Sequence, residues 1–201
     1  MFGKENVYVF PTIKKEKVIS KKTGKEIAPL TPGIAKKTTI MCNETGNWIT
    51  YKSDRYGFNN LDSEWDNETE FLLIGDSYTH GHCVSSKENI AGQIKEIINK
   101  NIINLGVEGT GPLRQLGVLK EYGANKKPKN LIWLYFEGND LDELDEELNN
   151  KVLIKYLEKN FTQSLMDHQE EININKTEKF NSIISKRDDL IYKIRFVRLY
   201  E

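Results

Sequence analysis

Three short apolar runs, each followed within two residues by a glycine, constrain the fold of this chain most. They are Phe71–Ile74, Ile102–Leu105 and Leu131–Phe136. Runs of this length without polar alternation are typical of strands buried on both faces of a parallel sheet. They start about 30 residues apart, the length of a strand–helix–strand unit, and such units place helices on the faces of the sheet. The sequence therefore predicts an α/β fold with a parallel sheet.

Helical patterns fill the intervals between these runs. Ser85-Ser86-Lys87-Glu88 offers a capping box before four isoleucines at helical spacing. A second helix is expected from Pro112, a residue suited to the first helical position, to Gly123. After the third run, apolar spacing predicts three more helices, over Leu141–Lys159, Gln163–Ile174 and Phe180–Tyr200.

The first 66 residues differ from the rest. Residues 1–40 hold nine lysines and three acidic residues, and prolines and glycines interrupt them. This basic charge is more typical of a solvated segment than of a binding patch. We expect one strand near Val7–Phe10 and a structured loop over Asp54–Asn60. The predicted organisation is an N-terminal arm and lead-in over 1–66 and the main domain over 67–201.

Charge and hydropathy exclude some partners. The net charge is −1, so nothing points to a nucleic acid. No apolar run approaches the roughly 20 residues of a membrane span, and the lysine-rich N-terminus, broken by Pro11, does not have the pattern of a signal peptide. The chain is therefore expected to be soluble, while its localisation stays undetermined by sequence.

The chain has two cysteines, Cys42 and Cys83. They are too few for a disulfide scaffold, and too few for a zinc cage without other ligands, so we expect no metal and no cofactor. Two interpretations of the pair remain open. Separate buried thiols are favoured for the chain alone, whereas a bridge is favoured for an exported protein.

Residues suited to acyl transfer follow each of the three runs. In open α/β sheets, sites form just beyond the carboxyl ends of the strands. Ser77, after the first run, can supply a nucleophilic hydroxyl. Gly109, after the second, has no side chain, so its N–H can approach an oxyanion, and Asn139, after the third, offers an amide donor. The sequence therefore predicts Ser77, Gly109 and Asn139 as the catalytic residues.

The segments around these residues resemble the conserved blocks of the SGNH/GDSL hydrolase family. Gly75-Asp76-Ser77-Tyr78 is similar to the first block, Asn104-Leu105-Gly106-Val107-Glu108-Gly109 to the second, and Gly138-Asn139-Asp140 to the third, in the same order and spacing. In the third block Glu137 stands where the family has glycine. The resemblance implies a three-layer α/β/α sandwich of the SGNH hydrolase or flavodoxin-like type, with Ser77 as nucleophile.

Further segments resemble a bacterial subgroup of that family associated with cell-envelope polysaccharide. They are Tyr56–Asn60, Gly81–Val84, Gly111–Leu113 and Trp133–Leu141. The resemblance implies a serine esterase or acylhydrolase whose substrate is an acylated carbohydrate or a small ester. The alternatives are an O-acyltransferase acting on envelope polysaccharide and an inactive scaffold that kept the fold.

One block of the family has no counterpart. The family's base lies in an Asp-x-x-His block near the C-terminus, and no such block follows Asn139. Asp167 and His168 are adjacent in a predicted helix, and we expect His168 to be solvated there. His80 and His82 are expected as polar residues near the substrate mouth. The sequence therefore predicts a fragment, incomplete at its C-terminus, whose continuation adds strand, helix and Asp-x-x-His, and which has little activity alone.

Several features also have simpler interpretations. Ser77 could be a helix N-cap, and Asp76 is expected to hydrogen-bond the turn. The glycines of residues 106–111 do not follow the order of a phosphate-binding loop. The seven acids of residues 137–147 fit a solvated helix face better than a calcium loop. Trp48 and Trp133 are expected to lie in the core or to pack on other side chains rather than to bind sugars.

Overall fold

The computed structural model describes residues 18–44 and 46–197. Its centre is a three-stranded parallel sheet in the order β6-β5-β7, formed by β5 (Phe71–Gly75), β6 (Ile102–Asn104) and β7 (Asn130–Leu134). Leu72 of β5 lies opposite Ile103 on one side and Leu131 on the other. The three predicted strands and their parallel pairing are thus confirmed.

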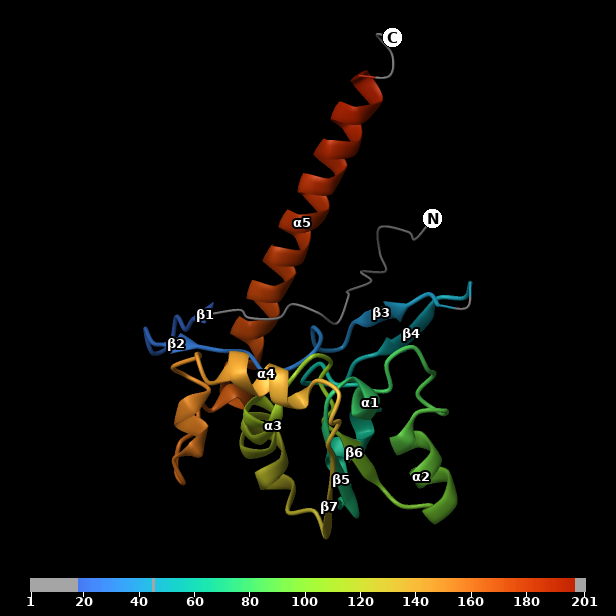
Figure 1. Ribbon diagram of the computed structural model, residues 1–201, viewed down its shortest axis with the longest axis vertical. Helices are drawn as coiled ribbons and strands as arrows, with labels where there is room; N and C mark the ends of the chain where they lie inside the picture. Colours follow the sequence, from blue (N-terminus) through green and yellow to red (C-terminus); the bar gives the residue numbers. More distant parts are fainter. Residues whose placement is uncertain (1–17, 45, 198–201) are drawn as a thin grey trace.

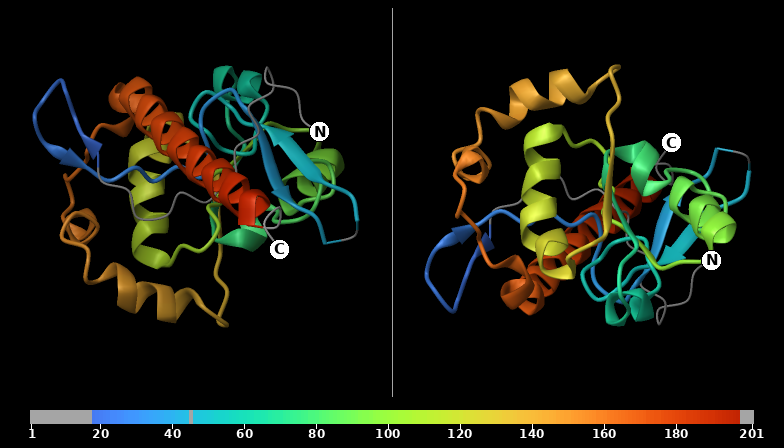
Figure 2. Two further views of the ribbon diagram at one scale, coloured as in Figure 1. Left: turned by 90° about the horizontal axis from the view of Figure 1, so that it is seen from above. Right: turned by 90° about the horizontal axis from the view of Figure 1, so that it is seen from below.

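Helices follow each strand. After β5 come α1 (Ser77–His80) and α2 (Ile90–Ile98), and after β6 come α3 (Pro112–Val118), a π-helical turn (Leu119–Gly123) and a 3₁₀ turn (Ala124–Lys126). In two perpendicular directions of view, α2 and α3 lie on opposite sides of the sheet (Figures 1 and 2). The protein is therefore an α/β protein, with mixed helix and strand around a parallel sheet.

The start of α2 differs from the expected capping box. Asn89 caps this helix, because its side chain accepts a hydrogen bond from the Gly92 amide at 2.8 Å. The Ser85 hydroxyl instead donates to the Glu88 carboxylate at 2.7 Å, within the preceding turn. The prediction of a Ser85 cap was therefore wrong by one turn, since the helix starts after Asn89, four residues further on.

The chain after β7 also departs from the predicted helices. It forms α4 (Asp140–Glu147), two 3₁₀ turns (Ile154–Leu157 and Leu165–His168) and the long helix α5 (Gln169–Val197). Ser164, with φ of 54°, interrupts the helical backbone before the second 3₁₀ turn. Helix α5 projects away from the rest of the molecule (Figure 1). No helix in the described ranges combines the length and apolar character that crossing a membrane requires.

The lead-in forms two small antiparallel sheets, which apolar patterning does not reveal. One pairs β1 (Val18–Ile19) with β2 (Glu26–Ile27), and the other pairs β3 (Thr38–Cys42) with β4 (Ile49–Lys52). A 3₁₀ turn (Asp62–Asp66) precedes β5. The strand predicted near Val7–Phe10 lies outside the described residues.

The loop that follows β4 is structured, as predicted. Asp54 is fully buried and accepts hydrogen bonds from the backbone amides of Tyr56 and Phe58, from the Asn60 side chain and from the Trp65 indole. Burial raises the pKa of the Asp54 carboxyl. Leu30 and Phe58 belong to the same hydrophobic core as the strands, so the lead-in packs directly against the sheet.

Candidate active site

The turn after β5 presents Ser77. Gly75 has φ of +154°, and a Cβ atom there would lie closer than 3.0 Å to the Thr79 side chain and to the Leu134 carbonyl oxygen, so only glycine fits. Asp76, not Ser77, is the N-cap of α1: its carboxylate accepts from the Tyr78 amide at 3.0 Å. The interpretation of Ser77 as a cap was therefore wrong, and Asp76 stabilises the turn as expected.

The Ser77 hydroxyl is oriented by its neighbour. Its Oγ lies 3.4 Å from Oδ2 of Asp76, a long hydrogen bond in which the hydroxyl donates. Within the described part of the chain, no histidine ring bonds to this hydroxyl. A serine hydroxyl needs a base to become a good nucleophile, and the side chain bonded to this hydroxyl is the Asp76 carboxylate.

The loop after β6 lies against this turn. The Val107 amide donates to the Gly75 carbonyl oxygen at 3.0 Å, so the β6 loop continues alongside the end of β5. The Asn104 side chain donates to the Thr79 carbonyl oxygen and accepts from the Gly106 amide. Gly109 follows, in a turn with φ of +61°. This loop is therefore fastened to α1 before it reaches Gly109.

The loop after β7 lies on the other side of the turn. The rings of Tyr78 and Phe136 pack with their centroids 4.8 Å apart, which joins the residue after Ser77 to this loop. Asp140 accepts from the Phe136 amide, and burial, with a smaller contribution from the charge of Asp76, raises the pKa of Asp140. Asn139 is the N-cap residue of α4, and its Oδ1 is buried without a hydrogen-bond partner among the described residues.

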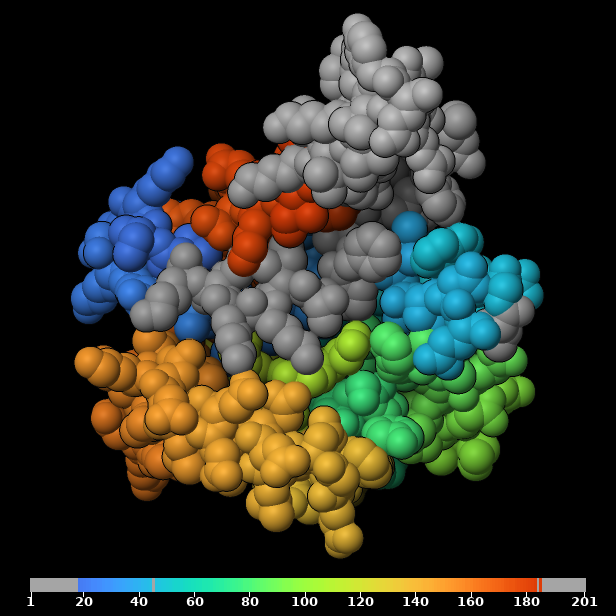
Figure 3. Space-filling model, turned by 45° about the horizontal axis from the view of Figure 1, so that its top comes forward, coloured from blue at the N-terminus to red at the C-terminus, as the bar shows by residue number. Residues whose placement is uncertain are grey.

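The three predicted residues thus lie on loops that meet at one end of the sheet. Ser77 follows the central strand, and Gly109 and Asn139 follow the strands that pair with it on either side. Helices α1 and α4 start from this same end (Figure 1). In the space-filling view, α1 lies between the flank formed by α4 with the segment after it and the flank formed by β3, β4 and α2 (Figure 3).

The histidines near Ser77 differ from one another. His80 is fully buried, its Nε2 lies 3.3 Å from the Tyr51 hydroxyl, and burial lowers its pKa to about 4. The expectation that His80 lies at a substrate mouth was therefore wrong, because it faces the core side of a one-turn helix.

His82 is partly exposed and lies beside the strand-end loops. Its amide donates to the Ser77 carbonyl oxygen at 3.0 Å, and its Nδ1 lies 3.2 Å from Oε2 of Glu108. Sequence reasoning did not single out Glu108. The only sequence signal was its place directly before Gly109 in the second block.

His168 lies far along the chain in a different environment. It is buried, with Nδ1 3.0 Å from Oε2 of Glu171 and 3.3 Å from the Ser20 hydroxyl. The prediction of a solvated residue was wrong, because β1 packs against the start of α5 and covers this ring.

Other expectations about side chains also change. Most of the acidic residues in 137–147 face outward, but Asp140 and Glu147 are buried, and Glu147 accepts from the amides of Gly111, Leu113 and Arg114 at the start of α3. Trp48 and Trp133 are each about half exposed, so of the two expected environments the core is excluded and packing on other side chains remains. Trp133 packs on Tyr135, and its indole donates to Gln115.

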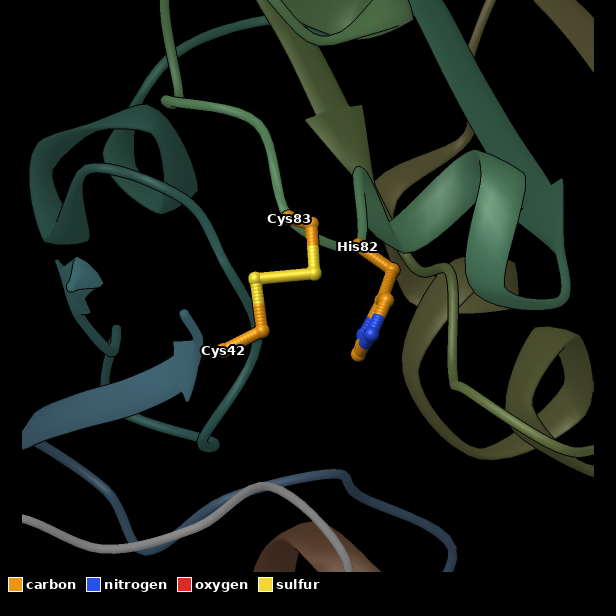
Figure 4. Close-up of side chains that lie close together, drawn as sticks. All are labelled: Cys42, His82 and Cys83. Carbon is orange, nitrogen blue, oxygen red and sulfur yellow. A yellow bond between two sulfur atoms is a disulfide. The ribbon is translucent and has the colours of Figure 1, made fainter. Parts of the chain in front are cut away.

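Cys42 and Cys83 form a disulfide, with their Cα atoms 5.5 Å apart (Figure 4). The expectation of separate thiols for the chain alone was wrong. The hairpin β3–β4 brings the end of β3 beside the loop after α1, and a separation under about 7 Å permits the bond. The bridge pins the lead-in next to the residues that follow Ser77.

An apolar hollow of about 390 Å³ lies beside β7. Side chains of β5, β7, α3, α4 and the 3₁₀ turn at Ile154–Leu157 line it, including Ile74, Leu116, Trp133 and Leu144. Ile74 and Pro112, which also line the hollow, each lie three residues along the chain from a predicted site residue, Ser77 and Gly109 respectively.

Comparison with models of known protein families found no match, and neither did comparison with curated proteins or with solved structures.

Proposed function

We propose that this protein is a serine esterase or acylhydrolase of the SGNH type. The observation that carries the proposal is that the loops bearing Ser77, Gly109 and Asn139 follow three adjacent parallel strands and contact one another. In this proposal the Ser77 hydroxyl attacks the ester carbonyl, and the amides of Ser77 and Gly109 with the Asn139 side chain stabilise the oxyanion. Water then releases the acyl group.

A three-layer α/β/α sandwich is part of the proposal. Its support is the parallel sheet with α2 and α3 on opposite sides (Figure 2). A further strand and helix of the same polypeptide, beyond Glu201, would pair with β7. The support is that β7 is an edge strand whose side chains Leu131 and Trp133 are 48% and 52% exposed. Exposed, apolar edge strands are usually covered in native proteins.

The base is proposed to come from that same continuation. None of the three histidines is bonded to the Ser77 hydroxyl within the described residues, although the resemblance calls for an Asp-x-x-His block. The 201-residue chain should therefore have little or no esterase activity, with any residual rate arising from the oxyanion donors and binding. A natural stop codon directly after Glu201 would contradict this.

The proposed substrate is an acylated carbohydrate or a small ester. The partly exposed Trp133 and Tyr135 offer aromatic surface near the hollow, and the hollow itself is apolar enough for an acyl chain. If a sugar hydroxyl replaces water as acceptor, the protein is instead an O-acyltransferase on envelope polysaccharide. If no base is supplied, it is a binding scaffold.

A fluorophosphonate probe tests the proposal. In the polypeptide extended to its natural C-terminus, we expect stoichiometric labelling that Ser77→Ala abolishes and that Ser63→Ala, a change at an exposed serine, leaves intact. Mass spectrometry of the labelled peptide locates the adduct. Absence of labelling in that folded protein would favour the inactive scaffold, and product formation that depends on an added sugar acceptor would favour the transferase. Ester turnover by the 201-residue chain, abolished by Ser77→Ala, would show that no further base is needed.

A further inference from the structure

Three side chains with soft or nitrogen donor atoms gather where the lead-in meets the loop after α1. Cys42, His82 and Cys83 each offer one ligand atom, and these atoms all lie within 4.8 Å of one another (Figure 4). All three residues are partly exposed. The cluster therefore lies close to the surface, although Nδ1 of His82 is itself buried.

The backbone holds this group together by bonds other than the disulfide. Cys42 ends β3 and pairs with Ile49 across the hairpin. The Cys83 amide donates to the Met41 sulfur at 3.0 Å, and the His82 amide donates to the Ser77 carbonyl oxygen. The two sulfurs should therefore stay close to each other and to the imidazole when the bond between them is broken.

Glu108 completes the arrangement around His82. Its carboxylate lies 3.2 Å from Nδ1 of the imidazole. Nδ1 makes no hydrogen bond among the described residues, so a small side-chain rotation is needed before this carboxylate can orient the imidazole, as carboxylates commonly do for histidines that bind zinc. The second cluster of the chain that contains a histidine and a carboxylate, His168 with Glu171, has no cysteine beside it.

We propose that Cys42, Cys83 and His82 form a zinc site when their disulfide is reduced. Two thiolates and one imidazole are a donor set that Zn²⁺ prefers, with water as the fourth ligand. On tetrahedral zinc, with Zn–S bonds of about 2.3 Å, two sulfurs lie about 3.8 Å apart. A Cα separation of 5.5 Å allows that spacing by rotation of the side chains alone. The two cysteines, too few for a zinc site on their own, gain their third ligand from the neighbouring histidine.

The chemistry balances with a dithiol as the reductant. The dithiol transfers two electrons and two protons to the disulfide, giving two cysteine thiols, and becomes a disulfide itself. Zn²⁺ then displaces the two thiol protons, which pass to solvent. The sulfurs cannot be bonded to each other and ligate the metal as thiolates at the same time. The reduction potential of the surroundings therefore determines whether the protein holds the disulfide or the zinc ion.

The test is a Co²⁺ titration of the purified chain, oxidised and reduced, under anaerobic conditions. Reduction with a phosphine and removal of the reductant precede the titration. We expect the reduced protein to bind one Co²⁺ with the thiolate charge-transfer and d–d absorption of a tetrahedral site, and one equivalent of Zn²⁺ to abolish that spectrum. The oxidised protein should show neither.

Variants identify the ligands. Cys42→Ser should remove the charge-transfer band, and His82→Ala should weaken Zn²⁺ binding at least as much as the roughly 10- to 100-fold expected for Glu108→Gln. Glu137→Gln, at an exposed carboxylate outside the cluster, is the matched control and should leave affinity unchanged. Far-UV circular dichroism verifies the fold of every sample.

Three results would overturn the proposal. They are a folded, reduced wild type that binds no stoichiometric metal, a Co²⁺ spectrum and affinity that His82→Ala does not change, and loss of the fold on reduction, since the ligand group requires the fold. None of these results bears on labelling of Ser77, so the zinc site and the esterase are tested separately.

Discussion

The two strands that flank β5 make the same pairing but have different surroundings. In β6, Ile102 and Ile103 are at most 2% exposed, whereas in β7 Leu131 and Trp133 are about half exposed. On the β6 side, the Asn60 side chain donates to the Asn104 carbonyl oxygen and accepts from its amide, so the lead-in covers that edge. No described residue makes such side-chain hydrogen bonds to the outer edge of β7.

This difference shows that strand pairing alone does not complete a sheet. Strands β6 and β7 both pair with β5 through backbone hydrogen bonds. Only β6 also has buried side chains and an outer edge that is covered by another segment. An uncovered apolar edge favours association with another strand. Among the described residues, the sheet therefore has a covered β6 side and an uncovered β7 side. Four predictions test that division.

The largest difference in stability is expected between alanine substitutions at two glycines, one in the loop after β6 and one in the loop after β7. A Cβ at Gly106 would lie closer than 3.0 Å to the His80 amide nitrogen and to Thr79 backbone atoms, which cannot move without displacing α1. Gly106→Ala should therefore lower the free energy of unfolding by about 3 kcal/mol or more. Gly138→Ala meets mainly the ring of Phe136, which is partly exposed and can rotate, so it should cost about 1 kcal/mol or less. Urea denaturation of both variants measures this, and equal losses would contradict the division.

The second prediction compares the loss of stability caused by the same leucine-to-alanine substitution on β5 and on β7. Leu72 and Leu131 face each other across the ladder, yet Leu72 is fully buried and Leu131 is not. Leu72→Ala should destabilise the protein by about 2–5 kcal/mol, because it leaves a cavity. Leu131→Ala should cost about 1 kcal/mol or less in the 201-residue chain. In a polypeptide whose continuation covers β7, the Leu131→Ala loss should rise toward that of Leu72→Ala.

The third prediction concerns the donors that the two sides contribute. The β6 side offers the backbone amide of Gly109, and the β7 side offers the Asn139 side chain, which an alanine substitution removes. In a form that turns over esters, Asn139→Ala should lower kcat by roughly 10²–10³ with little change in KM, because the donor acts on charge that develops in the transition state. Steady-state kinetics check this. A raised KM with unchanged kcat would instead make Asn139 a substrate-binding residue.

The smallest effect is expected from a charge on the open edge. Leu131→Lys should change the free energy of unfolding by only about 0.5 kcal/mol, since the side chain is half exposed. It should reduce self-association of the chain at high concentration, because edge lysines discourage strand pairing. Sedimentation velocity measures this, with Asn149→Lys as a control for added charge. A wild type that stays monomeric at high concentration would contradict an open, associating edge.

The sequence predicted the sheet well because its signals are local. Each central strand is a continuous apolar run, and glycines mark the positions where the chain turns at its end. The same signals predicted which three loops carry Ser77, Gly109 and Asn139, since parallel strands bring their carboxyl ends to one edge. The cap of α2 and the boundaries of α4 and α5 were less accurate, because competing local hydrogen bonds, such as that of Asn89, decide them.

Tertiary structure alone decided which distant residues meet. The Cys42–Cys83 bridge joins residues 41 positions apart, and the Ser20–His168 contact joins residues 148 positions apart. The burial of His80, the pairing of His82 with Glu108 and the cover that Asn60 provides for β6 are likewise set by packing between segments that no local pattern relates. The physical reason is that apolar periodicity and turn residues act over a few neighbouring positions, whereas partners and burial depend on the arrangement of the whole chain.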